Sequence, residues 1–314
     1  MRGTQMINLL GRRYIFFAIS LLIIVPGLVL AIVGGLRLSV DFTGGTLIEF
    51  DLNPAPLPQP AEVIAIYNRL GIEDVQVQTT GEDSLIARSS FLDDETRAAL
   101  LADIEAEFNQ SPNVLRFDSV GPTVGREVAT RALFAVGVAA FIVVIYITFA
   151  FRGIPHALRY GICAIIAMIH DVALVISLGA IGGYLWGWQI DALFLTALLT
   201  VIGFSVQDKI VVFDRIRENS NIYKKLPFET LVNHSIIQTL QRSINTQLMT
   251  VEFMLLALAL FGGVTLREFA VILLVGLFSG TYSSIFIAAP VLVVWENHEW
   301  KTWFRRGKSE EALA

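Results

Sequence analysis

The strongest constraint on this chain is a series of long stretches that contain no Asp, Glu, Lys or Arg. They cover residues 14–36, 132–151, 172–190, 192–207, 253–266 and 269–295. Most of them approach or exceed the roughly 20 apolar residues that an α-helix needs to cross a bilayer. Charged residues make up 16% of the chain, whereas an ordinary soluble domain contains about 25%. We therefore predict a polytopic α-helical membrane protein.

The shorter stretches become long enough to span a membrane if they include a buried ionisable residue. With that extension the sequence predicts six transmembrane helices, at residues 14–36, 129–151, 159–183, 190–213, 243–266 and 269–295. The uncharged run of the first span is longer than the 7–15 apolar residues of a signal peptide, so we expect a retained anchor.

Basic residues predict the orientation of these spans. They precede the first span and follow the second, fourth and sixth, at Arg2, Arg12, Arg13, Arg152, Arg159, Arg215, Arg217, Lys224, Lys225, Lys301, Arg305, Arg306 and Lys308. The positive-inside rule makes these segments cytoplasmic. We therefore expect tails 1–13 and 298–314 and loop 214–242 in the cytoplasm, region 126–297 in the plasma (inner) membrane, and segment 37–125 outside.

Segment 37–125 is predicted to be a separate exported domain. It holds fifteen Asp and Glu residues against five Arg and no Lys. Its alternating patterns predict strands at 46–50, 75–79, 85–88 and 114–118 and helices at 62–70 and 93–108. This β-α-β-β-α-β order predicts an α+β ferredoxin-like sandwich, a fold that hosts many functions and identifies none.

Several classes of function are disfavoured by the sequence. It contains no GxxxxGK[ST], HExxH or GxSxG motif, so we expect neither an enzyme nor a cofactor. Cys163 is the only cysteine, which excludes a disulfide or a multi-cysteine metal site within the chain. The acidic balance argues against a nucleic-acid partner.

Ionisable residues inside the predicted spans are the candidate functional groups. They are His170, Asp171, Asp208, Lys209, Glu252 and, at a span boundary, Arg242. A charge at the centre of a membrane helix costs about 2.5–3.5 kcal/mol, so such residues usually face protein or a water-filled cavity. A mid-membrane carboxylate opposite a fixed guanidinium could carry protons.

Two interpretations of Asp208 remain open at this point: it is a proton relay, or it ends its helix at the cytoplasmic interface. For Lys209 we expect the ammonium group to extend to that interface. Ser205 and Asp208, three residues apart, should share one helix face, which we expect to pack against the face carrying Arg242.

The other ionisable groups have weaker predictions. His170 and Asp171 are adjacent, so at most one should face Asp208; either could extend a proton path, but a histidine that bonds to a neighbouring helix is the favoured interpretation. Glu252 could face a partner subunit or a water-filled crevice. The four-residue repeat of small residues from Gly276 to residue 288 predicts helix packing.

Four segments together resemble the SecF family, the smaller membrane subunits of SecDF protein-export complexes. They are DFTGGT at 41–46, GFSVQDKIVVFDRIREN at 203–219, RSINTQLMT at 242–250 and SGTYSSIFIAAP at 279–290. The resemblance covers the whole chain and implies the resistance-nodulation-division superfamily. It also implies use of the proton-motive force, with SecD, the SecYEG channel, SecA, preproteins, membrane lipid and possible YajC and YidC subunits as partners.

The resemblance carries over to individual residues. It implies a proton-transport role for Asp208 and places the arginine of the fifth-span motif at Arg242. Where the family often has Asn-Asp-Thr, this chain has Gln207, Asp208 and Lys209. Two other classes of function stay open: a proton-coupled exporter of lipid or small molecules, and a passive scaffold of the translocase.

The glycine-containing motif after the first span has two interpretations. Asp41, Phe42, Thr43, Gly44 and Gly45 could form a hinge that transmits movement, or a structural turn into the first strand, which is the favoured interpretation.

Overall fold

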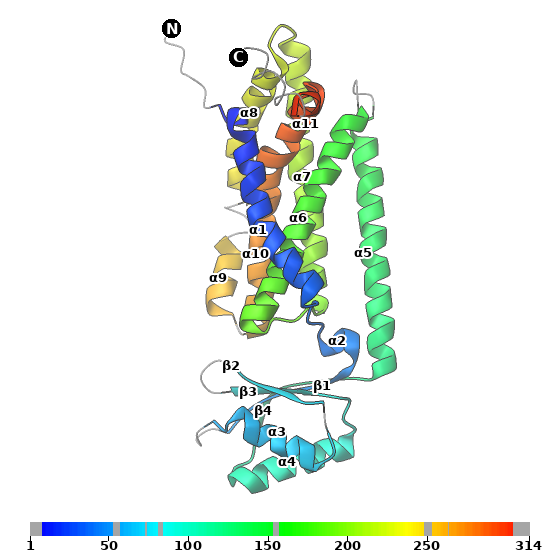
Figure 1. Ribbon diagram of the computed structural model, residues 1–314, viewed down its shortest axis with the longest axis vertical. Helices are drawn as coiled ribbons and strands as arrows, with labels where there is room; N and C mark the ends of the chain where they lie inside the picture. Colours follow the sequence, from blue (N-terminus) through cyan, green and yellow to red (C-terminus); the bar gives the residue numbers. More distant parts are fainter. Residues whose placement is uncertain are drawn as a thin grey trace, which may run out of the picture. The chain divides into compact units, whose positions relative to one another are not determined.

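The computed structural model describes residues 8–52, 57–72, 74–80, 84–152, 157–247, 253–262 and 264–303. The chain divides into two compact units. One is an α/β unit, Leu38–Ala135, and the other is a helical unit made of Met1–Arg37 and Val136–Ala314. Figure 1 shows both units and labels most of their helices and strands.

The α/β unit contains a four-stranded antiparallel sheet and two long helices. In chain order its elements are α2 (Val40–Thr43), β1 (Gly45–Asp51), α3 (Pro60–Arg69), β2 (Gln76–Thr80), β3 (Ser84–Ser89), α4 (Asp94–Phe108) and β4 (Asn113–Val120). The sheet order is β2-β3-β1-β4, and α3 and α4 cover one of its faces (Figure 1). The predicted β-α-β-β-α-β order is confirmed.

Local signals in the sequence determine these elements. The Asp93 carboxylate caps α4 by accepting a hydrogen bond of 2.8 Å from the Thr96 amide. The fully buried side chains Phe50, Tyr67 and Leu100 come from the sheet and the two helices and form one core. The structure therefore follows the pattern that the sequence predicts for an independent domain.

The motif at residues 41–45 forms a compact turn. Helix α2 is followed by Gly44 with φ of 74° and Gly45 with φ of 129°. A Cβ atom on Gly44 would lie 2.6 Å from the Cα of Pro122, so only glycine fits this path. The predicted turn into the first strand is confirmed, and the hinge role stays a prediction.

The helical unit consists of long apolar helices. They are α1 (Arg13–Val33), α5 (Pro122–Ala150, which begins in the α/β unit), α6 (Ala157–Trp186), α7 (Ala192–Ile222), α8 (Phe228–Gln247), α9 (Phe253–Phe261), α10 (Val264–Ser283), the π-helical turn η3 (Ser284–Ala288), α11 (Ala289–Glu296) and the short α12 (Trp300–Trp303). Within the described ranges, five helical segments are long and apolar enough to cross a membrane. They are Leu10–Val33, Pro122–Ala150, Ala157–Trp186, Ala192–Ile222 and Leu266–Glu296.

The fifth predicted span, residues 243–266, does not appear as one helix in the described part of the chain. Its first residues end α8, its central residues 248–252 lie outside the described ranges, and the nine residues of α9 follow. The predicted loop 214–242 is largely a helical hairpin of α7 and α8. The Asn219 amide closes this hairpin by donating to Ser235 Oγ at 2.8 Å and Gln238 Oε1 at 2.9 Å.

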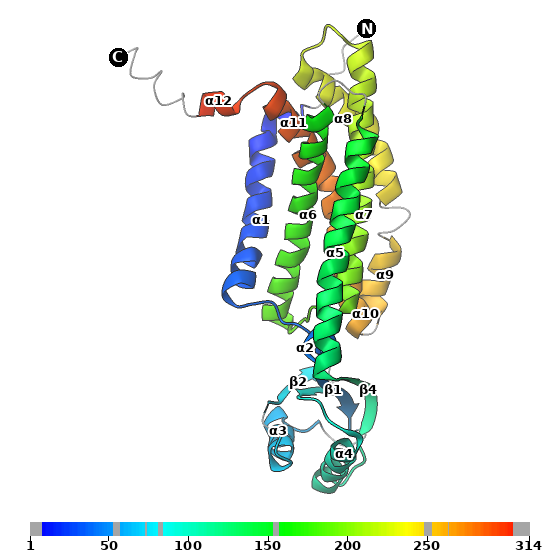
Figure 2. The ribbon, with the colours of Figure 1, turned by 90° about the vertical axis from the view of Figure 1, so that its right-hand side faces the viewer.

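Segments that were predicted to share one side of the membrane meet at one end of the helical unit. The Arg13 guanidinium binds Glu299 after α11 at 2.6 Å and Glu229 in α8 at 2.9 Å. Arg159, at the start of α6, pairs with Glu296 at the end of α11. Figure 2 shows the start of α1 and the helices α8 and α11 at this same end.

Candidate functional site

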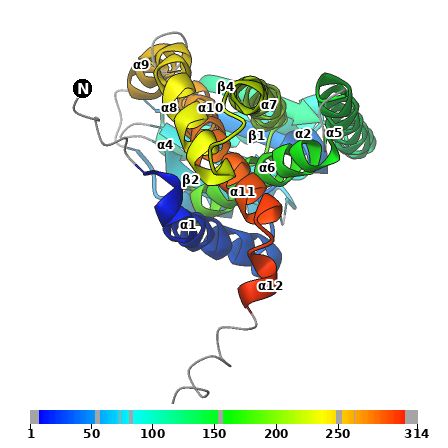
Figure 3. The same cartoon turned by 90° about the horizontal axis from the view of Figure 1, so that it is seen from above.

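A polar cluster lies inside the helical unit, where α6, α7 and α10 pack together. Figure 3 shows α10 beside α6 and α7 when the helices are viewed end-on. Close approach of α10 and α7 depends on Gly276, since a Cβ atom there would lie 2.4 Å from Val201 Cγ2. The predicted packing role of the small-residue repeat is confirmed for this position.

Asp171 of α6 is the centre of the cluster and has no exposed surface. Its Oδ1 atom accepts hydrogen bonds from Ser279 Oγ at 2.7 Å and His170 Nδ1 at 3.1 Å. Its Oδ2 atom accepts from Ser205 Oγ at 2.6 Å, Lys209 Nζ at 2.8 Å and Ser283 Oγ at 2.7 Å. Five donors surround one carboxylate, which is the environment of a stably charged group.

Lys209 of α7 is fully buried, so the predicted extension of its ammonium group to the interface is wrong. The ammonium donates to Asp171 Oδ2, to the Ser205 carbonyl at 3.2 Å and to Ser205 Oγ. All three of its hydrogens therefore have acceptors inside the protein. The side chain turns inward because a carboxylate on the adjacent helix compensates its charge.

Asp208 of α7 has a different environment and is half-buried. Its Oδ1 accepts from Ser243 Oγ of α8 at 2.7 Å, and its Oδ2 accepts from Ser284 Oγ of η3. Ser205, three residues before Asp208 on α7, donates its hydrogen bond to Asp171 and not to Asp208. Both partners of Asp208 are neutral hydroxyls, which can donate to a charged carboxylate or rotate to accept from a protonated one.

Arg242 does not pair with Asp208 in the described structure, contrary to the prediction. Its side chain is exposed, and no ion pair within the described ranges joins it to a carboxylate. Arg242 directly precedes Ser243, the α8 residue that does bind Asp208. The residue that binds Asp208 comes from the predicted segment, but it lies on a different face of α8 from Arg242.

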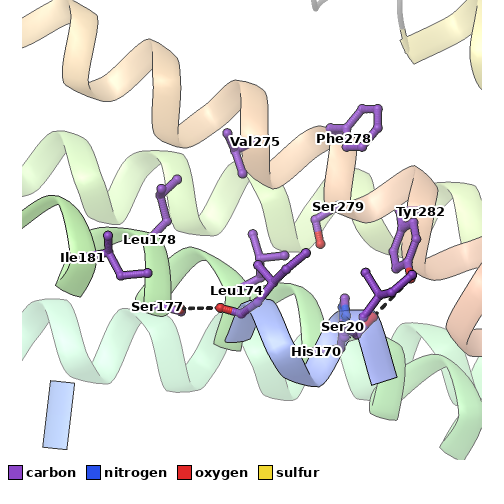
Figure 4. Close-up of a pocket in the computed structure, with 12 residues that line it drawn as sticks. Ser20, His170, Leu174, Ser177, Leu178, Ile181, Val275, Phe278, Ser279 and Tyr282 are labelled. Atoms are coloured by element: carbon purple, nitrogen blue, oxygen red, sulfur yellow. Dashed lines mark hydrogen bonds between the residues drawn. The ribbon is translucent and has the colours of Figure 1, made fainter. Parts of the chain in front are cut away.

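His170 lies beside a cavity of about 280 Å³ between α1, α6 and α10 (Figure 4). Within the described structure its Nε2 atom is buried and has no hydrogen-bond partner. The cavity is lined by aliphatic and aromatic side chains, among them Leu174, Leu178 and Val275, and by hydroxyl groups of serine and tyrosine side chains. Its Nδ1 partner is the adjacent Asp171 of its own helix, so among the described residues the predicted hydrogen bond to a neighbouring helix is not formed, although the His170 ring stacks with that of Tyr282 of α10.

The sequence analysis missed Ser279, Ser283 and Ser284 as functional contacts. Ser284 belongs to the small-residue repeat, which predicted packing alone. The signal was a group of hydroxyl side chains in the last span at helical spacing from residue 279. The π-helical turn that begins at Ser284 is a second signal visible only in the structure, because such turns occur frequently at functional sites.

Two further predicted groups lie in other parts of the sequence. Glu252 lies outside the described residues. Asp41, Phe42, Thr43, Gly44 and Gly45 belong to the α/β unit. Among the described residues, no three His, Cys, Asp or Glu side chains converge as metal ligands would.

Comparison with known families gives two matches. The model described as "Protein export membrane protein SecD/SecF, C-terminal" matches residues 101–298. The model described as "SecD/SecF GG Motif" matches residues 29–55, which contain the turn with Gly44 and Gly45.

Individual relatives agree with these matches. The chain is 68% identical over 302 residues to the protein translocase subunit SecF of Anaerolinea thermophila, covering 96% of this chain and 98% of that protein. It is 35% identical to the protein translocase subunit SecDF of Thermus thermophilus, covering 97% of this chain and 40% of the relative. A crystal structure of Thermus SecDF, titled a translocon-associated membrane protein, superposes with a TM-score of 0.81 at 32% identity, over 95% of this chain and 40% of that one.

Proposed function

Because this chain belongs to the SecD/SecF family of protein-export membrane proteins, we propose that it is a proton-driven accessory subunit of the Sec preprotein translocase. In this proposal it completes export through the SecYEG channel after SecA has inserted the preprotein. Protonation and deprotonation of Asp208 drive the cycle. The exported domain moves with that cycle and biases the preprotein outward.

One observation carries the assignment of the proton to Asp208. Among the described residues, Asp171 has a lysine partner at 2.8 Å, while the hydrogen-bond partners of Asp208 are the hydroxyls of Ser243 and Ser284. An ion pair favours the charged carboxylate, whereas hydroxyls accommodate both protonation states. Asp208 is therefore the carboxylate better suited to exchange a proton.

The exposed polar side chains around Asp208 support a partner subunit. Gln207 of α7 and Arg242, Asn245 and Thr246 of α8 are exposed in the isolated chain. Polar groups at membrane depth normally face protein or water. The relatives named SecDF are longer fused chains, of which this chain covers 40% in Thermus thermophilus. We propose that a SecD subunit supplies the other half, with Arg242 near the interface.

The membrane potential is the proposed energy source for this role. Moving one charge through 100 mV supplies about 2.3 kcal/mol. We assign the end of the bundle that carries Arg13 and Arg159 to the cytoplasm, because basic segments gather there. Protons would then reach Asp208 from the opposite side and leave toward the cytoplasm.

Two other functions compete with this one. An exporter of lipid or small molecules would also use a proton-binding carboxylate, but the relatives are named protein translocase subunits. A passive scaffold would not depend on the protonation of Asp208.

Export by inside-out membrane vesicles tests the proposal. Wild-type complex and the Asp208→Asn variant are compared with and without a proton gradient. We expect Asp208→Asn to lose the gradient-dependent part of export while ATP-driven insertion and assembly with SecD persist, and Asp208→Glu to keep part of the response. Equal gradient responses in Asp208→Asn and wild type would falsify the relay.

A further inference from the structure

Asp171 and Lys209 form a closed, charge-neutral unit. Neither side chain has exposed surface, each bonds to the other at 2.8 Å, and their remaining capacity is used by His170 and by serines from two helices. No bond from either side chain reaches Asp208. The pair is thus separate from the proposed relay in its hydrogen bonding.

The pair is nevertheless connected to the relay through the backbone at two points. On α7, Lys209 follows Asp208 directly. At the α10–η3 junction, Ser284, which binds Asp208, follows Ser283, which binds Asp171. A displacement of either helix that broke the Asp171 contacts would therefore move a residue of the Asp208 site.

We infer that Asp171 and Lys209 are positioning residues, which fix α6, α7 and α10 in the register that places Ser284 against Asp208. They keep their charges throughout the cycle and transfer no proton. This helix register requires α10 to lie close to α7, and the glycines of α10 allow it. A Cβ atom on Gly280 would lie 3.3 Å from the Cα of Ser205.

The physics of buried ion pairs distinguishes positioning from proton transfer. Removal of one partner leaves an uncompensated buried charge, whereas replacement of both by neutral side chains of similar size is often tolerated. A fixed pair should therefore be replaceable as a unit. A proton-carrying Asp171 could not be replaced by asparagine in any background.

The first experiment compares Asp171→Asn, Lys209→Met and the double variant in the complete complex. We expect each single change to lower the yield of folded, SecD-bound protein at least about tenfold. The double variant should recover most of that loss, which a double-mutant cycle quantifies. The matched control is the pair of Arg159 and Glu296, also an ion pair of α6 but partly exposed, where single changes should have little effect.

The second measurement is gradient-dependent export by the double variant. This inference rests on the proposed function, but the folding measurement above does not require it. We expect the double variant to export with the gradient response of the wild type within about threefold, because Asp208 is intact. A double variant that folds and assembles but has lost the response would overturn the inference that the pair can be replaced as a unit. An absent response in the wild type would instead contradict the proposed function.

Two serine variants decide the question if the double variant does not fold. Ser283→Ala removes one donor from Asp171, and Ser284→Ala removes one donor from Asp208, at adjacent positions. If Asp171 and Lys209 transfer no proton, the pH profile of gradient-dependent export should shift in the Ser284→Ala variant. In the Ser283→Ala variant the profile should keep the midpoint of the wild type. A shifted midpoint in Ser283→Ala would overturn the inference.

Discussion

Ser283 and Ser284 are neighbours in the chain, yet their hydroxyls donate to different carboxylates, Asp171 and Asp208. In a regular helix adjacent residues point about 100° apart, and the π-helical turn that begins at Ser284 adjusts that geometry. One helix junction therefore contacts both the ion-paired carboxylate and the carboxylate whose described partners are hydroxyl groups. The proposed division between a fixed pair and a proton-exchanging residue follows from this arrangement.

The first prediction concerns Glu299, which joins the end of α11 to α1 outside the membrane. Burial acts to raise the pKa of Glu299, but hydrogen bonds from Tyr14 and Arg13 outweigh it and hold the pKa below its usual value. A lowered folded-state pKa means that the carboxylate stabilises the fold above its unfolded pKa of about 4.3 and loses this effect as the pH falls through the folded value.

Thermal unfolding in detergent at several pH values measures this contribution. At pH 7 we expect Glu299→Gln to be roughly 1–2 kcal/mol less stable than the wild type, since the lost hydrogen bonds involve a charged group. The difference should shrink below about pH 4. Glu218→Gln is the control, because its partner Arg215 is exposed. Parallel pH curves for wild type and Glu299→Gln would refute the assignment.

The second prediction concerns the contact of α1 with α6. A Cβ atom on Gly27 would lie 1.9 Å from Ser177 Oγ and 2.5 Å from the Ser177 carbonyl oxygen. We expect Gly27→Ala to destabilise the helical unit by about 1–3 kcal/mol through overpacking. In Gly137→Ala the new methyl group meets nothing within 4 Å, so stability should stay equal or rise by up to about 1 kcal/mol. Equal unfolding temperatures for the two variants would contradict the close packing.

The third prediction concerns the SecD interface. Photo-cross-linking groups at Gln207 and Thr246, both exposed in the isolated chain, should capture SecD in native membranes. The control position is Val29, which is 50% exposed on α1 and is expected to face lipid. Capture of SecD from Val29 alone, or from none of the three positions, would argue against the proposed interface.

The fourth prediction concerns orientation. A reporter that is active only outside the cytoplasm should be active when fused near Gly81 and silent after Lys225 or at Ala314. The gathering of basic segments at one end of the bundle motivates this expectation. Activity at Lys225 would reverse the assignment of sides.

How far the sequence predicted the structure depended on the range of the interactions involved. The α/β domain was predicted strand by strand, because the alternation of residues along a strand is a local signal. The start of the fifth span was not predicted correctly, because α8 is polar and runs without a break from Phe228 to Gln247. The burial of Lys209 was not predictable either, because it depends on Asp171 of a separate helix. Sequence patterns reveal which residues share a helix face but not which helix lies against that face.

The central claim is that Asp208, and not Asp171, takes up the proton. Infrared difference spectroscopy of the complex in liposomes, recorded between neutral and acidic pH, detects the carbonyl band of a newly protonated carboxyl group. We expect the wild type to show the band of a membrane-embedded carboxyl group, which should be absent in Asp208→Asn and retained in the Asp171→Asn/Lys209→Met variant. A band that survives in Asp208→Asn and disappears in the double variant would contradict this claim.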